Sequence, residues 1–272
     1  MSMRCPIIAF CLLCLSALII MPVMGYPLTL VAYWSCDETG GNVLPDLTGG
    51  NDGTIYGAAL ATGKISNALA FNGDDVVNVA DATELKPAHF TIEAWIFINE
   101  TSGLADIVAK HQYGPDAGYE LRLYNGLLQF VMAGSSGWQV LSASSLSLNT
   151  WHHVVATYDG SQMVIYVNGI KQAFMAASSV SHSDSKLQIG GHDSWTGFER
   201  CFHGYIDEVA IYSEALPADV ILSHYLLGGE GHDYFFAVPE YPIGSLAAII
   251  VFFSAFMLHL RRTKRTSLHL VN

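Results

Sequence analysis

Alternation between bulky and small or polar side chains is the dominant pattern in the middle of the chain. Residues 90–98, FTIEAWIFI, place bulky side chains on both faces of an extended segment, which is typical of a strand in the middle of a sheet stack. Residues 120–132, ELRLYNGLLQFVM, contain two apolar runs on either side of Asn125-Gly126. This pair is preferred in type I′ turns because both central residues take positive φ, so the segment predicts a β-hairpin.

A second run of strands contains two adjacent histidines. Residues 149–169, NTWHHVVATYDGSQMVIYVNG, include one Asp-Gly and one Asn-Gly pair and are followed by IKQAF, which predicts a three-stranded meander. Successive side chains of a strand point to opposite faces. His152 and His153 are therefore expected to face apart, which excludes a metal or substrate site that both share.

The last predicted strand, residues 202–216, is followed by PADVILSHYLLGG. Pro217 is typical of a helix start, and Gly228-Gly229 of the position just past a helix end, which predicts one short helix. Many strands and one terminal helix indicate an all-β class. About 200 residues separate Pro27 from Gly229, which suits one large β-sandwich or two small domains.

Both ends of the chain are apolar. Residues 1–25 have one early charge, an apolar run and small residues at cleavage spacing, which predicts a signal peptide, with an uncleaved anchor as the alternative. Residues 243–260 are uncharged and long enough, at about 1.5 Å per residue, to cross a bilayer core of about 30 Å. A buried core helix is the alternative there. The basic residues 261–272 then predict a single-pass cell-membrane protein with residues 26–242 outside and a cytoplasmic C-terminus.

The charge distribution agrees with this division of the chain. Five of the 12 basic residues lie outside residues 26–242, whereas all 24 acidic residues lie within this segment, which therefore carries a net charge of about −17. A segment this acidic repels phosphate backbones. Nucleic acid is accordingly excluded as a partner.

Five segments occur in an order typical of one family. They are AYWSCDETGGNVLPDLTGGNDGTI (32–55), ALAFNGDDVVNV (68–79), FTIEAWIF (90–97), NTWHHVVATYDGSQMVIYVNG (149–169) and GYIDEVAIYSEALPADVI (204–221). Together they resemble the laminin-G-like (concanavalin A-like) jelly rolls in their bacterial and archaeal three-part form. The resemblance implies an all-β, two-sheet antiparallel jelly-roll sandwich over residues 26–229, followed by a linker at 230–242.

The resemblance also implies that the first and last strands are neighbours. Cys36 and Cys201 are the two cysteines outside the predicted signal peptide, and neighbouring strands would bring them within reach of a disulfide bond in an oxidising compartment. Two separate buried thiols are the alternative.

In the wider jelly-roll group, a structural Ca²⁺ often lies where the first and last strands meet. The matching side chains here are Asp37 and Asp207, with Asp74 or Asp75 contributing. Oxygen ligands from separate segments suit Ca²⁺, which accepts six to eight oxygens in loose geometry. The alternative is that Asp37 and Asp207 cap turns or face water.

The segment ahead of the predicted membrane span has a resemblance of its own. Residues 238–242, VPEYP, resemble archaeal surface-sorting signals in which a Pro-Glu-Phe motif precedes the span. Tyr241 stands where those signals have Phe. A plain transmembrane anchor is therefore the main interpretation, and cleavage with lipid replacement is the alternative.

Three glycine-rich loops carry side chains suited to sugar binding: residues 111–120, residues 134–139 and the segment GGHDSWTGFER. Aromatic faces stack on sugar rings, polar groups bind hydroxyls, and binding residues concentrate in loops on rigid sandwiches. These features predict a lectin-like surface module for carbohydrate or an extracellular partner. The alternatives are that both tryptophans pack over the sandwich ends, and that the protein is an adhesive envelope component acting through protein contacts. The candidate ligand-binding residues are Tyr113, Asp116, Trp138, His192, Asp193 and Trp195.

No catalytic motif is evident. Glycosidases on related jelly rolls use a Glu-x-Asp-x-x-Glu run, which places two carboxyl groups about 5–5.5 Å apart, and the chain has no such run. Asp207 and Glu208 are adjacent and are expected to face opposite sides of their strand. We therefore expect no enzymatic activity, with a glycoside hydrolase as the least favoured alternative. Asn99-Glu100-Thr101 is a sequon and predicts N-glycosylation of Asn99.

Overall fold

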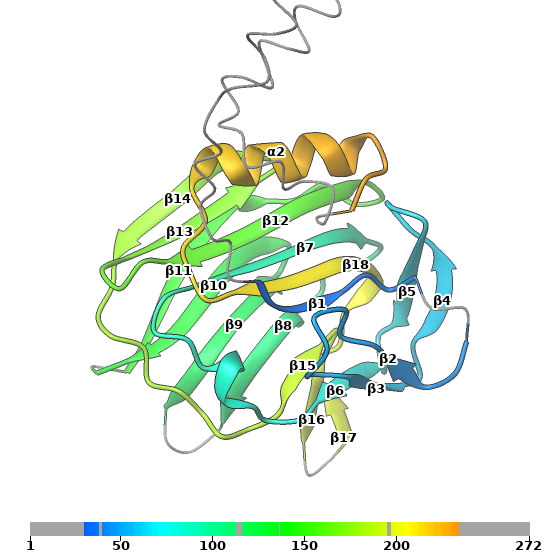
Figure 1. Cartoon of the computed structure of the whole chain (residues 1–272), viewed down its shortest axis with the longest axis horizontal. Helices are drawn as coiled ribbons and strands as arrows, with labels where there is room; N and C mark the ends of the chain where they lie inside the picture. The colour runs from blue at the N-terminus through cyan, green and yellow to red at the C-terminus, as the bar shows by residue number, and fades with distance from the viewer. Residues whose placement is uncertain (1–29, 38–39, 113–115, 136, 195–196, 234–272) are drawn as a thin grey trace, which may run out of the picture. The chain divides into compact units, whose positions relative to one another are not determined.

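The computed structural model describes residues 30–37, 40–112, 116–135, 137–194 and 197–233. The predicted signal peptide, sorting motif, membrane span and basic tail all lie outside this part of the chain. Within the part described, no helix combines the length and hydrophobicity that a membrane crossing requires. The described residues form two antiparallel sheets packed face to face, with one α-helix (Figure 1).

Sheet A and sheet B each contain eight strands. Sheet A has the order β14-β13-β12-β7-β18-β5-β4, and β1 also pairs with β18. Its strands are β1 (Leu30–Trp34), β4 (Ala59–Thr62), β5 (Asn67–Asn72), β7 (Phe90–Ile98), β12 (Trp151–Tyr158), β13 (Gln162–Val167), β14 (Ile170–Ala176) and β18 (His203–Tyr212).

Sheet B has the order β11-β10-β9-β8-β15-β6-β3-β2. Its strands are β2 (Val43–Leu44), β3 (Gly53–Tyr56), β6 (Val76–Val79), β8 (Leu104–Gln112), β9 (Ala117–Tyr124), β10 (Leu127–Gly134), β11 (Gly137–Ser145) and β15 (Leu187–Ile189). A separate hairpin contains β16 (His192–Ser194) and β17 (Gly197–Glu199), and the helices are the short 3₁₀ helix η1 (Thr83–Leu85) and α2 (Ala218–Gly229).

The strongest sequence patterns form the elements that they predict. The segment 90–98 is β7, which lies between β12 and β18 in the interior of sheet A. Asn125 and Gly126 have φ values of 48° and 83° in the turn between β9 and β10, as a type I′ turn requires. Residues 151–176 form the predicted meander β12-β13-β14. The predicted two-sheet antiparallel sandwich is therefore confirmed.

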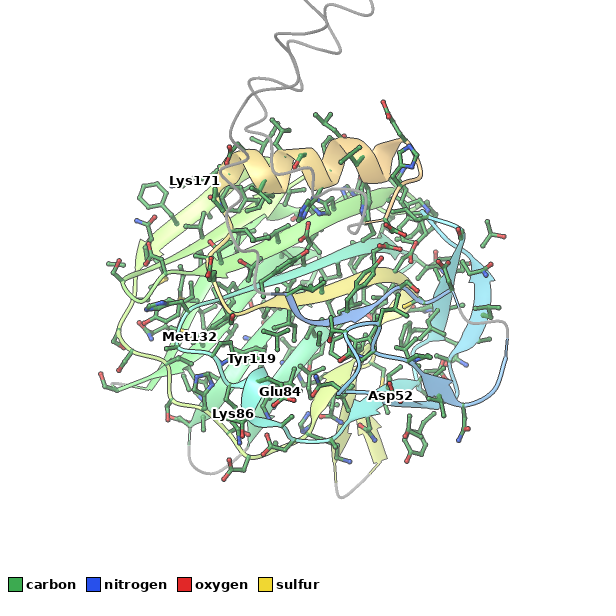
Figure 2. All side chains as sticks on the ribbon, viewed as in Figure 1. Asp52, Glu84, Lys86, Tyr119, Met132 and Lys171 are labelled. Carbon is green, nitrogen blue, oxygen red and sulfur yellow. The ribbon has the colours of Figure 1, made fainter. Side chains whose placement is uncertain are left out.

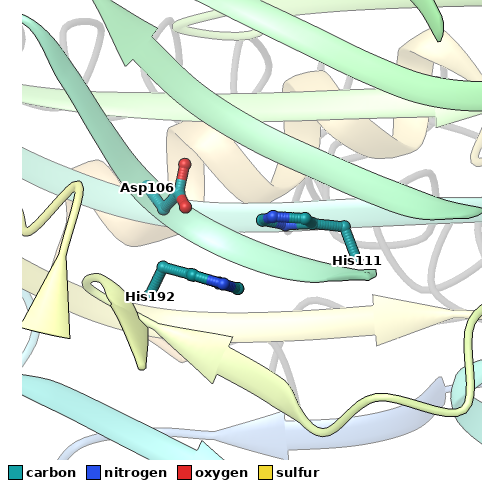
Figure 3. A group of neighbouring side chains, drawn as sticks. All are labelled: Asp106, His111 and His192. Atoms are coloured by element: carbon teal, nitrogen blue, oxygen red, sulfur yellow. The ribbon is translucent and has the colours of Figure 1, made fainter. Parts of the chain in front are cut away.

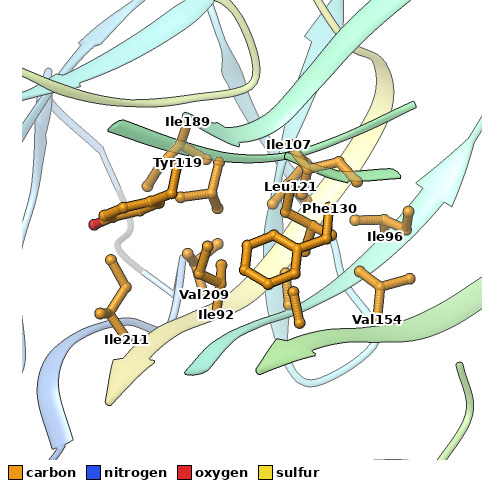
Figure 4. Packing of buried hydrophobic residues seen from close by; sticks show 14 of the residues in the cluster. Ile92, Ile96, Ile107, Tyr119, Leu121, Phe130, Val154, Ile189, Val209 and Ile211 are labelled. Carbon is orange, nitrogen blue, oxygen red and sulfur yellow. The ribbon is translucent and has the colours of Figure 1, made fainter. Parts of the chain in front are cut away.

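The hydrophobic core lies between the two sheets. Figure 4 shows side chains of sheet A, such as Ile92 and Val154, packed against Tyr119, Leu121 and Phe130 of sheet B. Tyr119 also donates from its hydroxyl group to the backbone oxygen of Leu85 in η1, at 2.9 Å. In contrast to these buried side chains, Lys171 on the edge strand β14 is exposed (Figure 2). Aromatic and branched side chains from both sheets thus fill the space between them.

The outer face of sheet A is covered by α2 (Figure 1). Tyr225 of α2 stacks on Trp95 with ring centroids 5.8 Å apart. Beneath the helix, the carboxylate of Glu93 contacts His153 Nε2 at 2.6 Å and His224 Nδ1 at 2.9 Å. Burial acts to raise the pKa of Glu93, but the two histidines outweigh it and lower the pKa to about 2.

The two adjacent histidines of β12 do face apart. His153 contacts Glu93 under α2, whereas His152 Nε2 contacts Ser147 on the other side of the strand. Pro217 is the N-cap of α2, as expected near a helix start. The predicted C-terminal boundary is wrong by two residues, because Gly228 and Gly229 are the last residues of the helix rather than the first beyond it.

The first and last strands of the described chain are neighbours, since β1 pairs with β18 from Leu30↔Tyr212 to Trp34↔Val209. The predicted disulfide is nevertheless not formed, and Cys36 and Cys201 are separate thiols. Cys36 lies two residues past Trp34, level with residue 207 of β18, whereas Cys201 lies six residues further along, just before β18 begins. At about 3.3 Å per residue the two positions are about 20 Å apart, and a disulfide needs Cα atoms within about 7 Å. Burial raises the pKa of the Cys201 thiol to about 11.

Candidate functional site

The outward face of sheet B is polar on four neighbouring strands. Alternation along each strand sends one set of side chains into the core and the other set outward. On the outward face, Ser142 of β11 pairs with Gln129 of β10. Gln129 pairs with Arg122 of β9, which in turn pairs with Asp106 of β8. The sheet register thus places polar side chains in one row across the strands.

These side chains are joined by hydrogen bonds and ion pairs. We call this set the polar network; it comprises Asp106, Glu120, Arg122, Gln129, Ser142 and Arg200. Arg200 comes from the segment after β17 and joins Asp106 to Glu120. The contacts run from Gln129 Nε2 to Ser142 Oγ (3.0 Å), Arg122 Nε to Gln129 Oε1 (3.1 Å), Arg122 Nη1 to Glu120 Oε2 (2.8 Å) and Arg200 Nη2 to Asp106 Oδ1 (2.6 Å).

The two carboxyl groups of the polar network differ in their pKa values. Burial raises the pKa of Asp106 to about 7, although Arg200 acts to lower it. Burial also acts to raise the pKa of Glu120, but Arg200, His111 and Arg122 outweigh it and hold that pKa below its usual range. The pKa of Glu120 is the lower of the two because its carboxylate contacts three cationic or imidazole side chains, those of His111, Arg122 and Arg200. Glu120 is therefore the anionic centre of the network.

Two histidines lie beside the polar network. His111 is near the end of β8 and His192 begins β16, and their rings stack with centroids 4.4 Å apart. Figure 3 shows both rings beside the carboxylate of Asp106. One nitrogen or oxygen atom of each of these three residues lies within 4.8 Å of the others, and all three residues are buried. Burial lowers the pKa of His111 to about 4, so its imidazole is neutral at pH 7.

Trp138 forms the exposed end of this face. It lies on β11 with 37% of its surface exposed, and its indole Nε1 donates to Asp116 Oδ1 at 2.7 Å. Its ring meets that of His111 edge to face, with centroids 6.2 Å apart. The indole is therefore held in position at the side of the network while part of its surface faces solvent.

The structure brings together some of the predicted ligand-binding residues. Trp138 and Asp116 share a hydrogen bond, and His192 reaches the same region through His111. Tyr113 and Trp195 lie outside the described residues, as does the side chain of Asp193. A ligand-binding role for Tyr113, Asp193 and Trp195 therefore stays a prediction.

Most of the polar network was not predicted from the sequence. The predicted binding residues lie in loops, whereas most side chains of the network lie on strands. Glu120 and Arg122 are two residues apart in a segment whose other side chains are apolar. Polar residues at period two on a strand whose other face is apolar predict an exposed or ligand-facing sheet surface. That signal was present at Glu120 and Arg122. Arg200 carries no such signal, since it reaches the network only through the folded hairpin.

A second acidic group, which contains Asp37, Asp207 and Glu208, lies where β1 and β18 meet. Asp207 and Glu208 were expected to face opposite sides of their strand, and this expectation is wrong. The register of β18 against β7 shifts between Asp207 and Ala210, and Glu208 takes a φ of 53°. Such a bulge adds a residue and turns its side chain. Glu208 consequently contacts the hydroxyl group of Tyr33, while Asp207 lies opposite Trp95 on the same face of the sheet.

This acidic group fits a cation in two respects. Asp207 Oδ1 and Glu208 Oε1 are buried oxygens that no described residue hydrogen-bonds, and Asp37 is close enough for its charge to act on both. Burial raises the pKa of Asp207 to about 8 and that of Glu208 to about 9. Buried carboxylic acids with open oxygens and acidic neighbours are the donor set that Ca²⁺ prefers.

Asp74 and Asp75 do not belong to this group. Asp37 Oδ1 accepts from the backbone of Asn67 at the start of β5, whereas Asp75 Oδ2 accepts from the backbone of Asn72 at its end. The two ends of this strand are about 17 Å apart at about 3.3 Å per residue. The prediction that Asp74 or Asp75 contributes to the same calcium site as Asp37 and Asp207 is therefore wrong.

The predicted glycosylation site is accessible. Asn99 directly follows β7 and is exposed, so its modification stays a prediction.

Sequence comparison connects this architecture to known proteins. The profile described as the concanavalin A-like lectin/glucanases superfamily matches residues 71–222. This stretch includes every strand that contributes to the polar network. A comparison with curated protein sequences finds no match.

Solved structures with a similar fold come from proteins of different kinds. Domain 4 of AbnA, a GH43 extracellular arabinanase from Geobacillus stearothermophilus in complex with arabinotriose, has a TM-score of 0.58 and 21% identity over 72% of this chain and 97% of that one. Trypanosoma rangeli sialidase in complex with 2,3-difluorosialic acid has a TM-score of 0.59 and 21% identity over 73% and 33%. The botulinum neurotoxin serotype D binding domain has a TM-score of 0.59 and 17% identity over 73% and 51%. At these identities the likeness shows the fold alone.

Proposed function

The chain belongs to the concanavalin A-like lectin/glucanases superfamily, and we propose that it is a non-catalytic module that binds carbohydrate on the outward face of sheet B. One observation carries the proposal. An exposed indole, that of Trp138, is fixed by Asp116 at the side of a hydrogen-bonded polar network. A sugar ring requires this combination of a flat apolar surface and polar groups held in place.

The proposed contacts divide between stacking and hydrogen bonding. Trp138, Val140 and Ser142 lie on the outward side of β11 and are exposed. Trp138 and Val140 would cover the apolar face of a sugar ring. Ser142 and the partly exposed Arg122 would bind its hydroxyl groups. Both polar side chains are already held by Gln129, so little conformational freedom is lost on binding.

The absence of catalysis is part of the proposal. The pKa values of Asp106 and Glu120 are pushed in opposite directions, which is the pattern of a general acid and its partner and is the one feature that favours a glycoside hydrolase. However, both side chains are buried, and Arg200 bridges them. A carboxyl group in that position has no open path to a glycosidic oxygen. Hydrolysis of a bound glycan that is abolished by Glu120→Gln would overturn this part.

We further propose that the module is exported and tethered to the cell membrane by residues 243–260, with the tail 261–272 inside. The apolar ends and the basic tail of the sequence support this placement. The alternative function is adhesion through protein contacts. It is supported by Ile170 and Phe174, which are 62% and 61% exposed on the edge strand β14, because exposed apolar side chains on an edge strand favour protein partners.

Calcium binding between β1 and β18 is also part of the proposal. Asp37, Asp207 and Glu208 would hold the ion, which would supply a positive partner for the open carboxyl oxygens of Asp207 and Glu208. Its role is structural, because it would join the first described strand to the last strand of sheet A.

The test of the main proposal is glycan binding by the full chain purified in detergent with Ca²⁺ present. A glycan array identifies the ligand, with arabinan and sialylated glycans included because ligands of this kind occupy the two sugar-bound neighbours. Trp138→Ala should weaken binding about tenfold or more, since truncating an anchoring aromatic residue costs about 2 kcal/mol and 1.4 kcal/mol is tenfold.

Phe174→Ala is the matched control for Trp138→Ala. Phe174 is an aromatic residue with 61% exposure on the other sheet, and its truncation should leave the affinity unchanged. Equal affinities for the wild type and Trp138→Ala would contradict the assignment of the sugar to this face. A silent array combined with cross-linking through β14 in native membranes would favour the adhesive alternative.

A further inference from the structure

Asp106, His111 and His192 form a compact group of metal-ligating side chains beside the polar network. One potential ligand atom from each lies within 4.8 Å of the others, and the three residues are 0%, 2% and 7% exposed. Figure 3 shows the carboxylate and both rings gathered between β8 and the start of β16. The geometry points to a binding site for a divalent transition metal, with Zn²⁺ as the expected ion, held by these three side chains.

The carboxylate offers an open coordination position. Asp106 Oδ1 accepts from Arg200 at 2.6 Å, whereas Asp106 Oδ2 is buried and is hydrogen-bonded by no described residue. An open carboxylate oxygen in a dry site costs free energy unless a donor or a cation meets it. A metal ion at Oδ2 would meet it while Arg200 keeps its bond to Oδ1.

The orientation of His111 also suits a metal ligand. Its Nδ1 lies 3.1 Å from Glu120 Oε1, so the carboxylate favours the tautomer that carries the proton on Nδ1. The lone pair is then on Nε2, the nitrogen that would coordinate the ion. Metal-binding histidines commonly have this carboxylate contact on the other nitrogen, and it fixes the ring and raises its basicity. Glu120 would thus be a positioning residue.

The donor set selects the class of ion. The charges of Asp106 and Glu120 are balanced by those of Arg122 and Arg200, so the group has no net negative charge to attract a hard cation. Affinity must therefore come from the imidazole nitrogens, which suit Zn²⁺ and its neighbours rather than Ca²⁺ or Mg²⁺. Three protein ligands leave the fourth tetrahedral position to water or to an incoming ligand.

Metal binding requires a change in the two rings. They are stacked at an interplanar angle of 16°, and a metal ion lies in the plane of the ring that coordinates it. Because Glu120 fixes the ring of His111, the change falls to His192. Rotation about its Cβ–Cγ bond, a torsion with a broad energy well, would direct both lone pairs to one point. The ion would then join β8 to the β16-β17 hairpin next to Trp138, independently of the proposed calcium site.

The experiment is titration of the metal-stripped full chain with Zn²⁺ and Co²⁺ in excess Ca²⁺, which keeps the proposed calcium site filled. We expect one Zn²⁺ per chain and the visible absorption of nitrogen-coordinated Co²⁺. Zn²⁺ at 100 times its Kd should raise the Tm by about 5–10 °C. A chain that binds no Zn²⁺, or the same amount in His192→Gln as in the wild type, would overturn the proposal.

Three variants separate binding from folding. His192→Gln and Asp106→Asn keep side-chain size and should fold, and each should weaken Zn²⁺ binding at least tenfold. His89→Ala is the control because His89 is exposed and far from the group in sequence, and it should bind like the wild type. If Asp106→Asn fails to fold, His192→Gln alone decides the outcome through its Co²⁺ spectrum. Glycan affinity measured in the same samples reports on the proposed function separately, since sugar binding without Zn²⁺ binding, or the reverse, distinguishes the two failures.

Discussion

The buried acids between β1 and β18 predict an unusual pH dependence of stability. In the unfolded chain Asp207 ionises near its ordinary pKa of 3.8, whereas in the calcium-free folded chain it ionises near 8. Between these values the folded protein holds a proton that the unfolded protein lacks. Stability from this group is therefore fully present below about pH 4 and is lost as the pH rises towards 8.

The magnitude follows from the shift in pKa. Each unit of difference between folded and unfolded states is worth about 1.4 kcal/mol, so ionisation of Asp207 alone removes about 4 kcal/mol between about pH 4 and pH 7. Glu208 acts in the same direction, since its pKa is raised to about 9. For a domain of this size, 4 kcal/mol corresponds to about 10 °C in Tm. Bound Ca²⁺ should cancel the loss by supplying the countercharge.

The assay is thermal unfolding of the full chain at several pH values, with chelator or with Ca²⁺. Asp207→Asn keeps the size of the side chain and cannot ionise. It should remove about half of the fall in Tm between pH 4 and pH 7, because Glu208 still contributes a similar amount, and most of the Ca²⁺ effect. Asp74→Asn is the matched control, because Asp74 is exposed at the opposite end of β5. Identical pH slopes for the wild type and Asp207→Asn would refute the reasoning.

Two further substitutions test the buried polar and backbone features of the fold. His224→Ala removes one of the two histidines on the buried carboxylate of Glu93 and should lower the free energy of unfolding by about 2–4 kcal/mol, measured by urea titration; a change below 0.5 kcal/mol, a threshold of about the size of a neutral surface substitution, would mean that His153 suffices. Gly118→Ala should cost about 3 kcal/mol or more, because Gly118 has a φ of 114° and an added Cβ would lie 1.9 Å from the backbone oxygen of Lys110; a Tm equal to that of the wild type would contradict this.

The fold was predictable because its strongest signals are local. Asn125-Gly126 specifies a turn whatever the rest of the chain does, and the alternation within 90–98 identifies a strand with two buried faces. Sheet order is different, because it depends on pairings between distant segments. The family resemblance implied that the first and last strands are neighbours. It could not show that Cys36 and Cys201 are staggered by about six residues along that pair.

The site was less predictable because local rules fail where the backbone is irregular. Strict alternation separates Asp207 from Glu208, and the bulge at Glu208 reverses that conclusion. The positive φ of Glu208 leaves no mark in the sequence, because glutamate, unlike glycine or asparagine, is not favoured in that conformation. Arg200 and His192 join the polar network and the histidine pair only because the hairpin returns to β8. Tertiary contacts of this kind follow from the folded chain and not from any one segment.

The pairing of β18 has a consequence for how the chain reaches its folded state. Along one edge, residues 203–206 of β18 bind β5 and residues 209–212 bind β1, while the other edge binds β7. The earlier strands β1, β5 and β7 therefore lack one partner until β18, which follows them in the sequence, has been synthesised. Until it arrives, their unpaired edges are open to association with other chains. Because these pairings join segments that are far apart in the sequence, we expect the sandwich to close slowly.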